Sequence, residues 1–184
     1  MPRKADPNLE RTIVDAAIRL LEKGGVEAIT MREVAKAART TTPTLYERFT
    51  DRDALLHAVT DIYRDRLGQK LNPNDSIAEM GEKFLEFCAE NPNAINLLIE
   101  RMAHNLKSST KGPIFQMVRT NLIKLNGLPP KTADEMTIAT TSTIAGAAFL
   151  MNRLGCTTRA SQELQDATLK MLQRVTMSNH KVKS

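Results

Sequence analysis

Residues 29–59 decide the fold, and they read ITMREVAKAARTTTPTLYERFTDRDALLHAV. Residues 30–33, TMRE, have the form of a capping box, in which a threonine caps a helix and a glutamate follows three positions later. They predict a short helix over about residues 31–38. A second short helix is expected over about residues 42–49, and only residues 39–41 separate the two. Two short helices joined by so tight a connection are typical of a helix-turn-helix.

The second helix of this pair carries polar side chains on the side that its apolar residues leave open. Leu45 and Phe49 are four positions apart and are expected to face inward together. In a helix-turn-helix the second helix lies in the major groove of DNA, while the first crosses the phosphate backbone. Hydroxyl, phenol and guanidinium groups bind phosphates or base edges. The candidates for DNA contact from this pattern are Thr42, Thr44, Tyr46 and Arg48, with Thr30 and Arg52 at helix starts and Arg3 and Lys4 in a short basic arm.

Each of these residues also fits a role that needs no DNA. Arg48 and Arg52 could be surface charges paired with neighbouring carboxylates, and Tyr46 could be half-buried packing. The threonines at positions 40–42 could be only turn and cap residues. The joint placement of these groups on one short, exposed helix is what favours duplex DNA as the partner.

Helical patterning continues along the rest of the chain and predicts an all-α protein. No alternation of apolar and polar residues indicates a strand, and no hairpin turn is visible. We expect a helix-turn-helix domain over residues 1–52 and a helical domain over residues 53–184. Besides the short pair, helices are expected over about residues 8–23, 52–71, 76–90, 91–106, 113–126, 132–154 and 161–177.

The composition narrows the possible classes of protein. The chain has 184 residues and a net charge of +5, which is modest and evenly spread, so charge alone does not identify a nucleic-acid binder. No apolar run is long enough for a membrane span, and no signal peptide opens the sequence. Cys88 and Cys156 are expected to be free thiols in a reducing cytoplasm. His57, His104 and His180 are scattered, so neither a metal nor a cofactor is expected.

Residues 29–59 resemble the N-terminal domain of the TetR family of transcriptional regulators. The preceding stretch IVDAAIRLLEKGGVEAIT, residues 13–30, resembles the first helix of that family and its exit. The Leu45-Tyr46 pair followed by Phe49, and then the helix start at residues 52–56, are the most specific part. The resemblance covers about the first third of the chain. It implies about nine helices, a homodimer built by the last two long helices, and a variable ligand pocket in the C-terminal domain.

The resemblance also implies roles for individual positions. By position, Thr30 and Arg32 match residues that contact the DNA backbone, and Tyr46 matches a phosphate-binding tyrosine. Thr41 matches the serine that starts the recognition helix, and Thr42 and Thr44 match base-reading residues. Arg52 matches the lysine that opens the fourth helix. Arg39 departs from the pattern, because the family usually has glycine there. If that position needs a positive φ, arginine costs roughly 1 kcal/mol or more, and Arg39 either adjusts the turn or adds a cation near the DNA. Thr40 replaces the usual apolar turn residue.

The C-terminal two-thirds of the sequence gives weaker signals for a pocket and an interface. Its apolar residues could line a ligand cavity or form plain core; the candidates for ligand contact are Phe84, Phe87, Met102, His104, Phe115 and Met117. Small residues three or four apart allow two helices to approach closely. The candidate dimer interface is therefore Ala139, Thr143 and Gly146, paired with Leu164, Thr168, Met171 and Val175. Packing of these faces within one chain is the alternative.

Three functional hypotheses follow. The favoured one is a homodimeric repressor that binds a pseudo-palindromic DNA site and responds to a small, mainly apolar effector. The second is an adaptor or structural protein on the same fold, which binds DNA without an inducer. The third is an enzyme, but the sequence shows no nucleophile–base arrangement and no glycine-rich phosphate loop, which argues against it.

Overall fold

A computed structural model describes residues 8–107 and 111–177 of the chain. Over these residues it contains nine α-helices and two short 3-10 helices, with no strand. The all-α prediction is therefore confirmed. The chain divides into two compact units, one ending at Arg64 and the other beginning at Asp65. The first unit thus extends past residue 52, where the sequence analysis placed the end of the helix-turn-helix domain.

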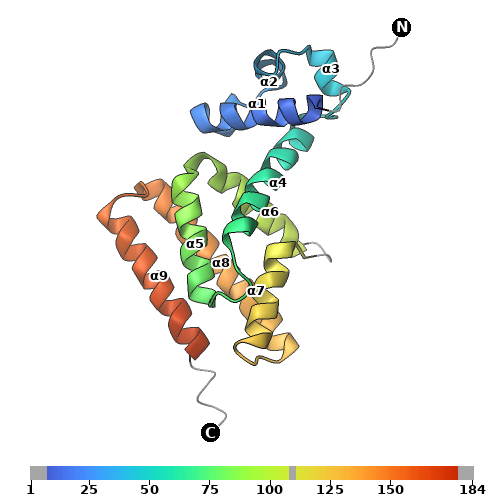
Figure 1. The fold of residues 1–184 in the computed structure, drawn as a ribbon. Helices are drawn as coiled ribbons and strands as arrows, with labels where there is room; N and C mark the ends of the chain where they lie inside the picture. Colours follow the sequence, from blue (N-terminus) through green and yellow to red (C-terminus); the bar gives the residue numbers. More distant parts are fainter. Residues whose placement is uncertain (1–7, 108–110, 178–184) are drawn as a thin grey trace. The chain divides into compact units, whose positions relative to one another are not determined.

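The N-terminal unit contains α1 (Leu9–Gly24), α2 (Met31–Ala37), α3 (Thr42–Tyr46) and the first part of α4 (Arg52–Lys70). Helix α1 packs against α2, and α2 packs against α3 (Figure 1). The buried face of α1 repeats at helical spacing, as expected for an amphipathic helix on a small core; it comprises Ile13, Val14, Ala16, Ala17, Ile18 and Leu21. Gly25, with φ of 70°, ends α1, and the 3-10 helix Val26–Ala28 leads into α2.

Helix α4 is attached to α1 by a buried tyrosine. The Tyr63 side chain is almost fully buried, and its hydroxyl donates a hydrogen bond to Glu22 Oε1 on α1 at 3.4 Å. The start of α4 is capped by Asp51, whose carboxylate accepts the Ala54 N–H at 2.7 Å. Both ends of this part of the helix are therefore fixed within the N-terminal unit.

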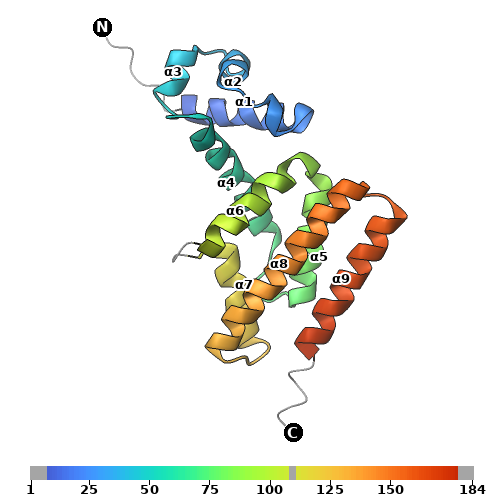
Figure 2. The same ribbon diagram turned by 180° about the vertical axis from the view of Figure 1, so that it is seen from behind.

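The C-terminal unit is a helical bundle built on α5, α7, α8 and α9. After α4 come α5 (Ile77–Glu90), the 3-10 helix Pro92–Ala94, α6 (Ile95–Lys107), α7 (Pro113–Lys124), α8 (Pro130–Leu154) and α9 (Arg159–Met177). Helix α8 packs against α5, α7 and α9, and Figure 2 shows α8 and α9 side by side. A Cβ atom at Gly81 on α5 would lie 2.8 Å from Leu172 Cδ1 on α9. Glycine at this position therefore lets the Leu172 side chain pack directly against α5.

Two helices differ in length from the sequence-based expectation. Helix α3 ends at Tyr46 rather than at Phe49, because the chain tightens into a turn in which the Arg48 N–H bonds to the Leu45 carbonyl. Helix α9 begins at Arg159 rather than at Ser161. The hydroxyl of Thr158 accepts the Ser161 N–H at 3.2 Å, so the helix starts two residues earlier than expected.

The loop between α4 and α5 is held by a buried asparagine of α7. Asn121 is 2% exposed, and its Nδ2 donates to the carbonyl oxygens of Pro73 and Asp75 at 3.2 and 2.5 Å. The Asp75 carboxylate in turn binds Lys83 Nζ at 2.6 Å and the Asn72 N–H at 2.9 Å. The hydrogen bond from Lys83 holds the pKa of Asp75 below its usual value, against the opposing effect of desolvation. One amide group thus joins a loop and a helix that are distant in sequence.

We expect Asn121→Asp to destabilise the protein more than Asn121→Ala does. Alanine removes two hydrogen bonds and should lower the free energy of unfolding by about 2 kcal/mol. Aspartate keeps the shape but places an acceptor against two carbonyl oxygens, and burial also penalises its charge. Urea denaturation at neutral pH measures both effects. The matched control is Asn96→Asp, an exposed position on α6, where the change should stay within about 0.5 kcal/mol. A fully stable Asn121→Asp protein would contradict this role for the amide.

Candidate DNA-binding surface

Helix α2 begins at a threonine cap that forms only half of a capping box. Thr30 has an extended backbone, and its hydroxyl accepts the Glu33 N–H at 3.2 Å. The Thr30 N–H donates to the Ala28 carbonyl at 3.2 Å. At the start of α5, by contrast, both bonds of the box between Ser76 and Glu79 are present. The cap at Thr30 still fixes where α2 begins, and it leaves Arg32 exposed in the first turn.

The turn between α2 and α3 is a Schellman motif with arginine in the left-handed position. The Thr40 N–H donates to the Ala35 carbonyl at 2.9 Å, and the Arg39 N–H donates to the Lys36 carbonyl at 3.2 Å. These two hydrogen bonds define a Schellman motif. In such a motif the residue that donates the shorter-range bond, here Arg39, adopts a positive φ. Arg39 has φ of 54°. The positive φ that would make arginine unfavourable at this position is therefore present.

Helix α3 is short and depends on its cap and its buried side chains. Thr41 has an extended backbone, and its hydroxyl accepts the Thr44 N–H at 3.3 Å and lies 2.8 Å from the Thr44 hydroxyl oxygen. Pro43 occupies the first turn, where its missing N–H leaves no helical bond unmade. Leu45 and Phe49 are both buried. The expectation that these two face the core is confirmed.

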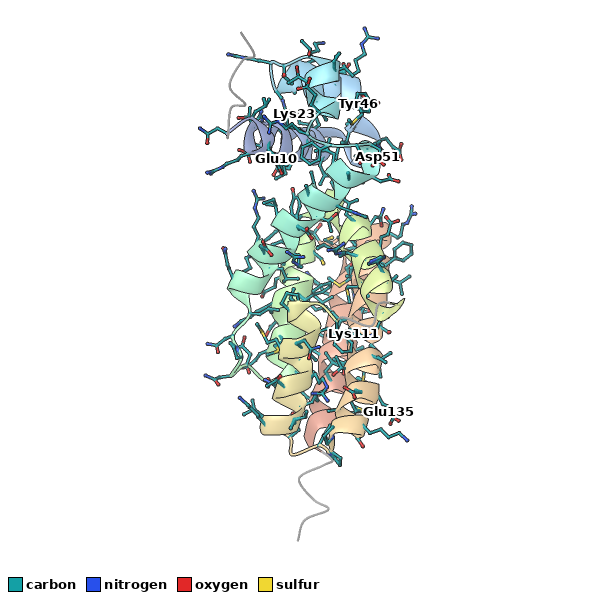
Figure 3. The ribbon with its side chains drawn as sticks, turned by 90° about the vertical axis from the view of Figure 1, so that its right-hand side faces the viewer. Glu10, Lys23, Tyr46, Asp51, Lys111 and Glu135 are labelled. Atoms are coloured by element: carbon teal, nitrogen blue, oxygen red, sulfur yellow. The ribbon has the colours of Figure 1, made fainter. Side chains whose placement is uncertain are left out.

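The part of the α3 segment that Leu45 and Phe49 leave accessible presents the polar residues predicted from the sequence. Tyr46 is 51% exposed, and Figure 3 shows it at the surface of the N-terminal unit. Thr42, Thr44 and Arg48 are half-buried, so part of each side chain is accessible. Thr41 is exposed at the cap. Hydroxyl, phenol and guanidinium groups thus share one short segment, as direct contact with a DNA groove requires.

Arg52 has a role that the sequence analysis missed. Its Nε donates to the Ile29 carbonyl at 2.6 Å, and its Nη2 donates to the Val26 carbonyl at 2.7 Å. The side chain therefore joins the start of α4 to the loop that precedes α2, a structural role beside the DNA contact that stays a prediction. No local pattern marks this role, because the bonded residues are more than twenty positions apart in the chain. Arg52 therefore helps to fix the segment that leads into the helix-turn-helix.

We expect Arg52→Ala to destabilise the N-terminal unit by about 2–3 kcal/mol, since it removes two charge-assisted hydrogen bonds to backbone carbonyls. Arg52→Lys should recover only part of this loss, because a single ammonium group cannot reproduce the geometry of the guanidinium fork. Thermal or urea unfolding followed by circular dichroism measures both variants. Arg11→Ala is the control: Arg11 is highly exposed on α1, and its removal should change stability little. Equal stability of the Arg52 and Arg11 alanine variants would contradict the structural role of Arg52.

The comparison with known families identifies this domain. The family model of the bacterial regulatory proteins of the tetR family matches residues 13–59, from α1 into α4. Residues 13–59 therefore form a domain similar to the N-terminal domain of that family. No curated protein matches the chain by sequence.

Solved structures of TetR-family and related regulators share the fold over nearly the whole chain. A TetR variant from Acinetobacter baumannii AYE, in complex with minocycline, is 19% identical and covers 98% of this chain and 99% of its own, with a TM-score of 0.71. A regulator from Streptomyces coelicolor is 15% identical and covers 95% and 84%, with a TM-score of 0.68. The multidrug binding protein EbrR, complexed with imidazole, is 21% identical and covers 94% and 93%, with a TM-score of 0.62. At these identities the likeness is one of fold.

The residues expected to bind a ligand come from three helices. Phe84 and Phe87 on α5 are buried, and Met102 on α6 is half-buried. Phe115 and Met117 on α7 are half-buried, whereas His104 on α6 is exposed. Two of the rings lie beside cations, since Lys70 Nζ is 5.6 Å from the centre of the Phe87 ring and Lys111 Nζ is 5.7 Å from that of Phe115. The set is therefore mixed, with buried aromatic rings and one exposed imidazole.

The residues expected at a dimer interface lie on two sides of their helices. Ala139 and Gly146 on α8 and Met171 on α9 are exposed, and Thr143 and Leu164 are half-buried. Thr168 is buried, and its hydroxyl donates to the Leu164 carbonyl at 2.8 Å. Thr168 therefore faces the interior of its own protomer and cannot contribute to a surface for a second copy. Val175 lies in α9, but its side chain is outside the described residues, as are Arg3 and Lys4 of the N-terminal arm.

Other predicted groups have simpler surroundings. Cys88 is buried, and desolvation, with a smaller effect from Cys156, raises the pKa of its thiol to about 12. Cys88 is therefore protonated at neutral pH. Within the described parts of the chain, no group of three or more histidine, cysteine, aspartate or glutamate residues is arranged to hold a metal ion. No helix over the same residues is long and apolar enough to cross a membrane.

Proposed function

We propose that this chain is a ligand-responsive transcriptional repressor that acts in the cytoplasm and binds a pseudo-palindromic DNA site as a homodimer. The observation that carries the proposal is the geometry of α3. Burial of Leu45 and Phe49 leaves Tyr46 exposed and Thr42 and Thr44 partly accessible on one short helix. This is the side of a recognition helix that enters the major groove in a helix-turn-helix protein.

The polar residues divide into base-reading and backbone-binding groups. Thr42 and Thr44 are near the N-terminal end of α3, the end of a recognition helix that contacts base edges. The Thr41 hydroxyl lies within hydrogen-bonding distance of the Thr44 hydroxyl, which restricts the orientation of Thr44. We assign the Tyr46 phenol and the Arg48 guanidinium to phosphate contacts, together with Thr30 and Arg32 at the start of α2 and Thr40 in the turn. Arg52 stabilises this surface through its hydrogen bonds to the Val26 and Ile29 carbonyls.

The proposal is tested by selecting duplexes from a random pool and measuring binding to those recovered. We expect enrichment of a pseudo-palindrome with half-sites about one helical turn, or a multiple of it, apart. Affinity should fall steeply as the salt concentration rises, because phosphate contacts release counterions. Binding that shows no preference for any palindrome over random duplex would overturn the proposal.

Single substitutions on α3 should separate the two groups of contacts. Tyr46→Phe removes only a hydroxyl and should weaken binding on every duplex by about 10-fold to 150-fold, since a lost hydrogen bond to a charged group is worth roughly 1.5–3 kcal/mol. Thr44→Val should instead change the preferred base at one position of each half-site. Fluorescence anisotropy on matched duplexes measures both. Thr120→Val, at an exposed site on α7, is the control and should bind as the unsubstituted protein does; equal binding by all three variants would argue against α3 as the reading helix.

The exposed face of α8 supports the homodimer. Ile138, Phe149, Leu150 and Leu154 are large apolar residues with 40–50% of their surface exposed. Gly146 lies among them, and a Cβ atom there would meet nothing within 4 Å in the protomer. Exposed apolar surface next to a position without a side chain suits close approach of a second helix. We propose that α8 and the exposed side of α9, including Met171, form the contact with the second copy.

We expect Gly146→Leu to stabilise the protomer and to weaken the dimer. A side chain at this position has free space within one chain, and replacing a helical glycine removes about 0.5–1 kcal/mol of unfavourable backbone entropy. The same side chain would block the approach of a second α8. Sedimentation velocity over a dilution series measures the shift toward monomer. Gly68→Leu is the matched control, because Gly68 is also helical and has equally open surroundings; an unchanged dimer in the Gly146 variant would contradict this interface.

The C-terminal unit is proposed to bind a small, mainly apolar effector among α5, α6 and α7. Phe84, Phe87, Met102, His104, Phe115 and Met117 are the proposed contacts. The likeness in fold to proteins solved with minocycline and with imidazole supports this assignment. A thermal-shift screen of apolar and amphipathic compounds tests it, because a ligand of the folded state raises the melting temperature. Consistent absence of stabilisation would favour the adaptor that binds DNA without an inducer.

A further inference from the structure

Arg39 is the one residue other than glycine with a positive φ among the described residues. Gly25, Gly127 and Gly155 occupy the other positions of this kind. In the left-handed region the Cβ atom of an L-residue crowds the following carbonyl oxygen, and glycine avoids that contact. The chain therefore uses the favourable residue at three such positions and an unfavourable one at the turn of the helix-turn-helix.

No hydrogen bond or ion pair within the described residues offsets the strain at Arg39. The side chain is exposed, and within the described residues its guanidinium has no hydrogen bond and no ion pair. Arg52, which lies behind the same motif, uses its guanidinium to bind two backbone carbonyls. A residue that is strained and whose side chain makes no hydrogen bond or ion pair within the described residues points to a function outside the protomer.

The position of Arg39 brings it close to the reading helix. Only Thr40 separates it from Thr41, the cap of α3, and two residues of chain span at most about 7 Å. When Thr42 and Thr44 approach base edges, the sugar–phosphate strand that borders the groove is the nearest polyanion. A guanidinium group forms two parallel hydrogen bonds with one phosphate.

We propose that Arg39 is a phosphate-binding residue, which adds affinity for DNA while making the turn less stable than glycine would. This inference rests on the proposed DNA-binding function, and it concerns the DNA backbone and not the base sequence. It also gives a reason for the departure from glycine at this position. Glycine at position 39 would remove both the strain and the phosphate contact, whereas glutamine would remove only the contact. Substitution therefore separates the two effects.

Three variants at this position test the proposal. Arg39→Gly should raise the melting temperature by about 2–4 °C, which is the shift expected for relief of left-handed strain in a chain of this size. It should also weaken DNA binding about tenfold and reduce the slope of log K against log salt by about 0.9, the effect of losing one phosphate contact. Arg39→Gln keeps the Cβ atom and removes the charge, so it should lose the same affinity and slope without the gain in melting temperature. Arg39→Lys should retain the slope.

The experiment distinguishes a failure of the Arg39 contact from a failure of the proposed DNA-binding function. Arg159→Ala, at an exposed site on α9, removes one positive charge from the C-terminal unit and should leave the salt slope unchanged. If the unsubstituted protein prefers no duplex over random DNA, the DNA-binding proposal fails. If it binds selectively and the Gly and Gln variants at position 39 keep its affinity and salt slope, the phosphate contact of Arg39 is overturned while the reading helix stands.

Discussion

The burial of Leu45 and Phe49 is the constraint on which the proposed DNA-binding surface depends. Helix α3 has only five residues, and so short a helix is not stable in water without tertiary contacts. Leu45 within the helix and Phe49 just after it fix the rotation of α3 about its own axis, and the Thr41 cap fixes where the helix begins. Once that rotation is set, the side on which Thr42, Thr44 and Tyr46 lie follows from the geometry of the helix.

Three arginines of the N-terminal unit show how one residue type takes different roles. Arg52 is bonded to the Val26 and Ile29 carbonyls, and therefore connects α4 to the segment that carries the cap of α2. Arg48 lies half-buried directly after α3, and Arg39 is exposed at the turn with a positive φ. A guanidinium that already donates hydrogen bonds inside the protomer, as that of Arg52 does, has a structural role. A guanidinium without such bonds is available to a phosphate.

The C-terminal unit combines close packing inside the protomer with an apolar exterior on α8. Thr137, Ile144, Ala148 and Met151 form the buried side of that helix. The opposite side exposes large apolar residues around Gly146. An apolar side that the described part of the protomer leaves exposed suits contact with a partner. This is the physical reason for placing a second copy of the chain against α8.

The sequence by itself determined the features that depend on neighbouring residues. Caps at Thr30 and Thr41, proline in the first turn and the spacing of Leu45 and Phe49 are local signals, and they were enough to predict the helix-turn-helix and the all-α fold. The sequence left open whether position 39 needs a positive φ, and the Schellman turn, with φ of 54° at Arg39, decided it.

Only the tertiary structure decided which partners distant residues meet. The bonds from Arg52 to Val26 and Ile29, and from Asn121 to the loop before α5, join positions far apart in the chain. The burial of Thr168 depends on which side of α9 faces α5 and α8, and a threonine fits either side. Sequence patterns report periodicity along one helix, whereas burial and hydrogen bonding are set by how helices pack against one another.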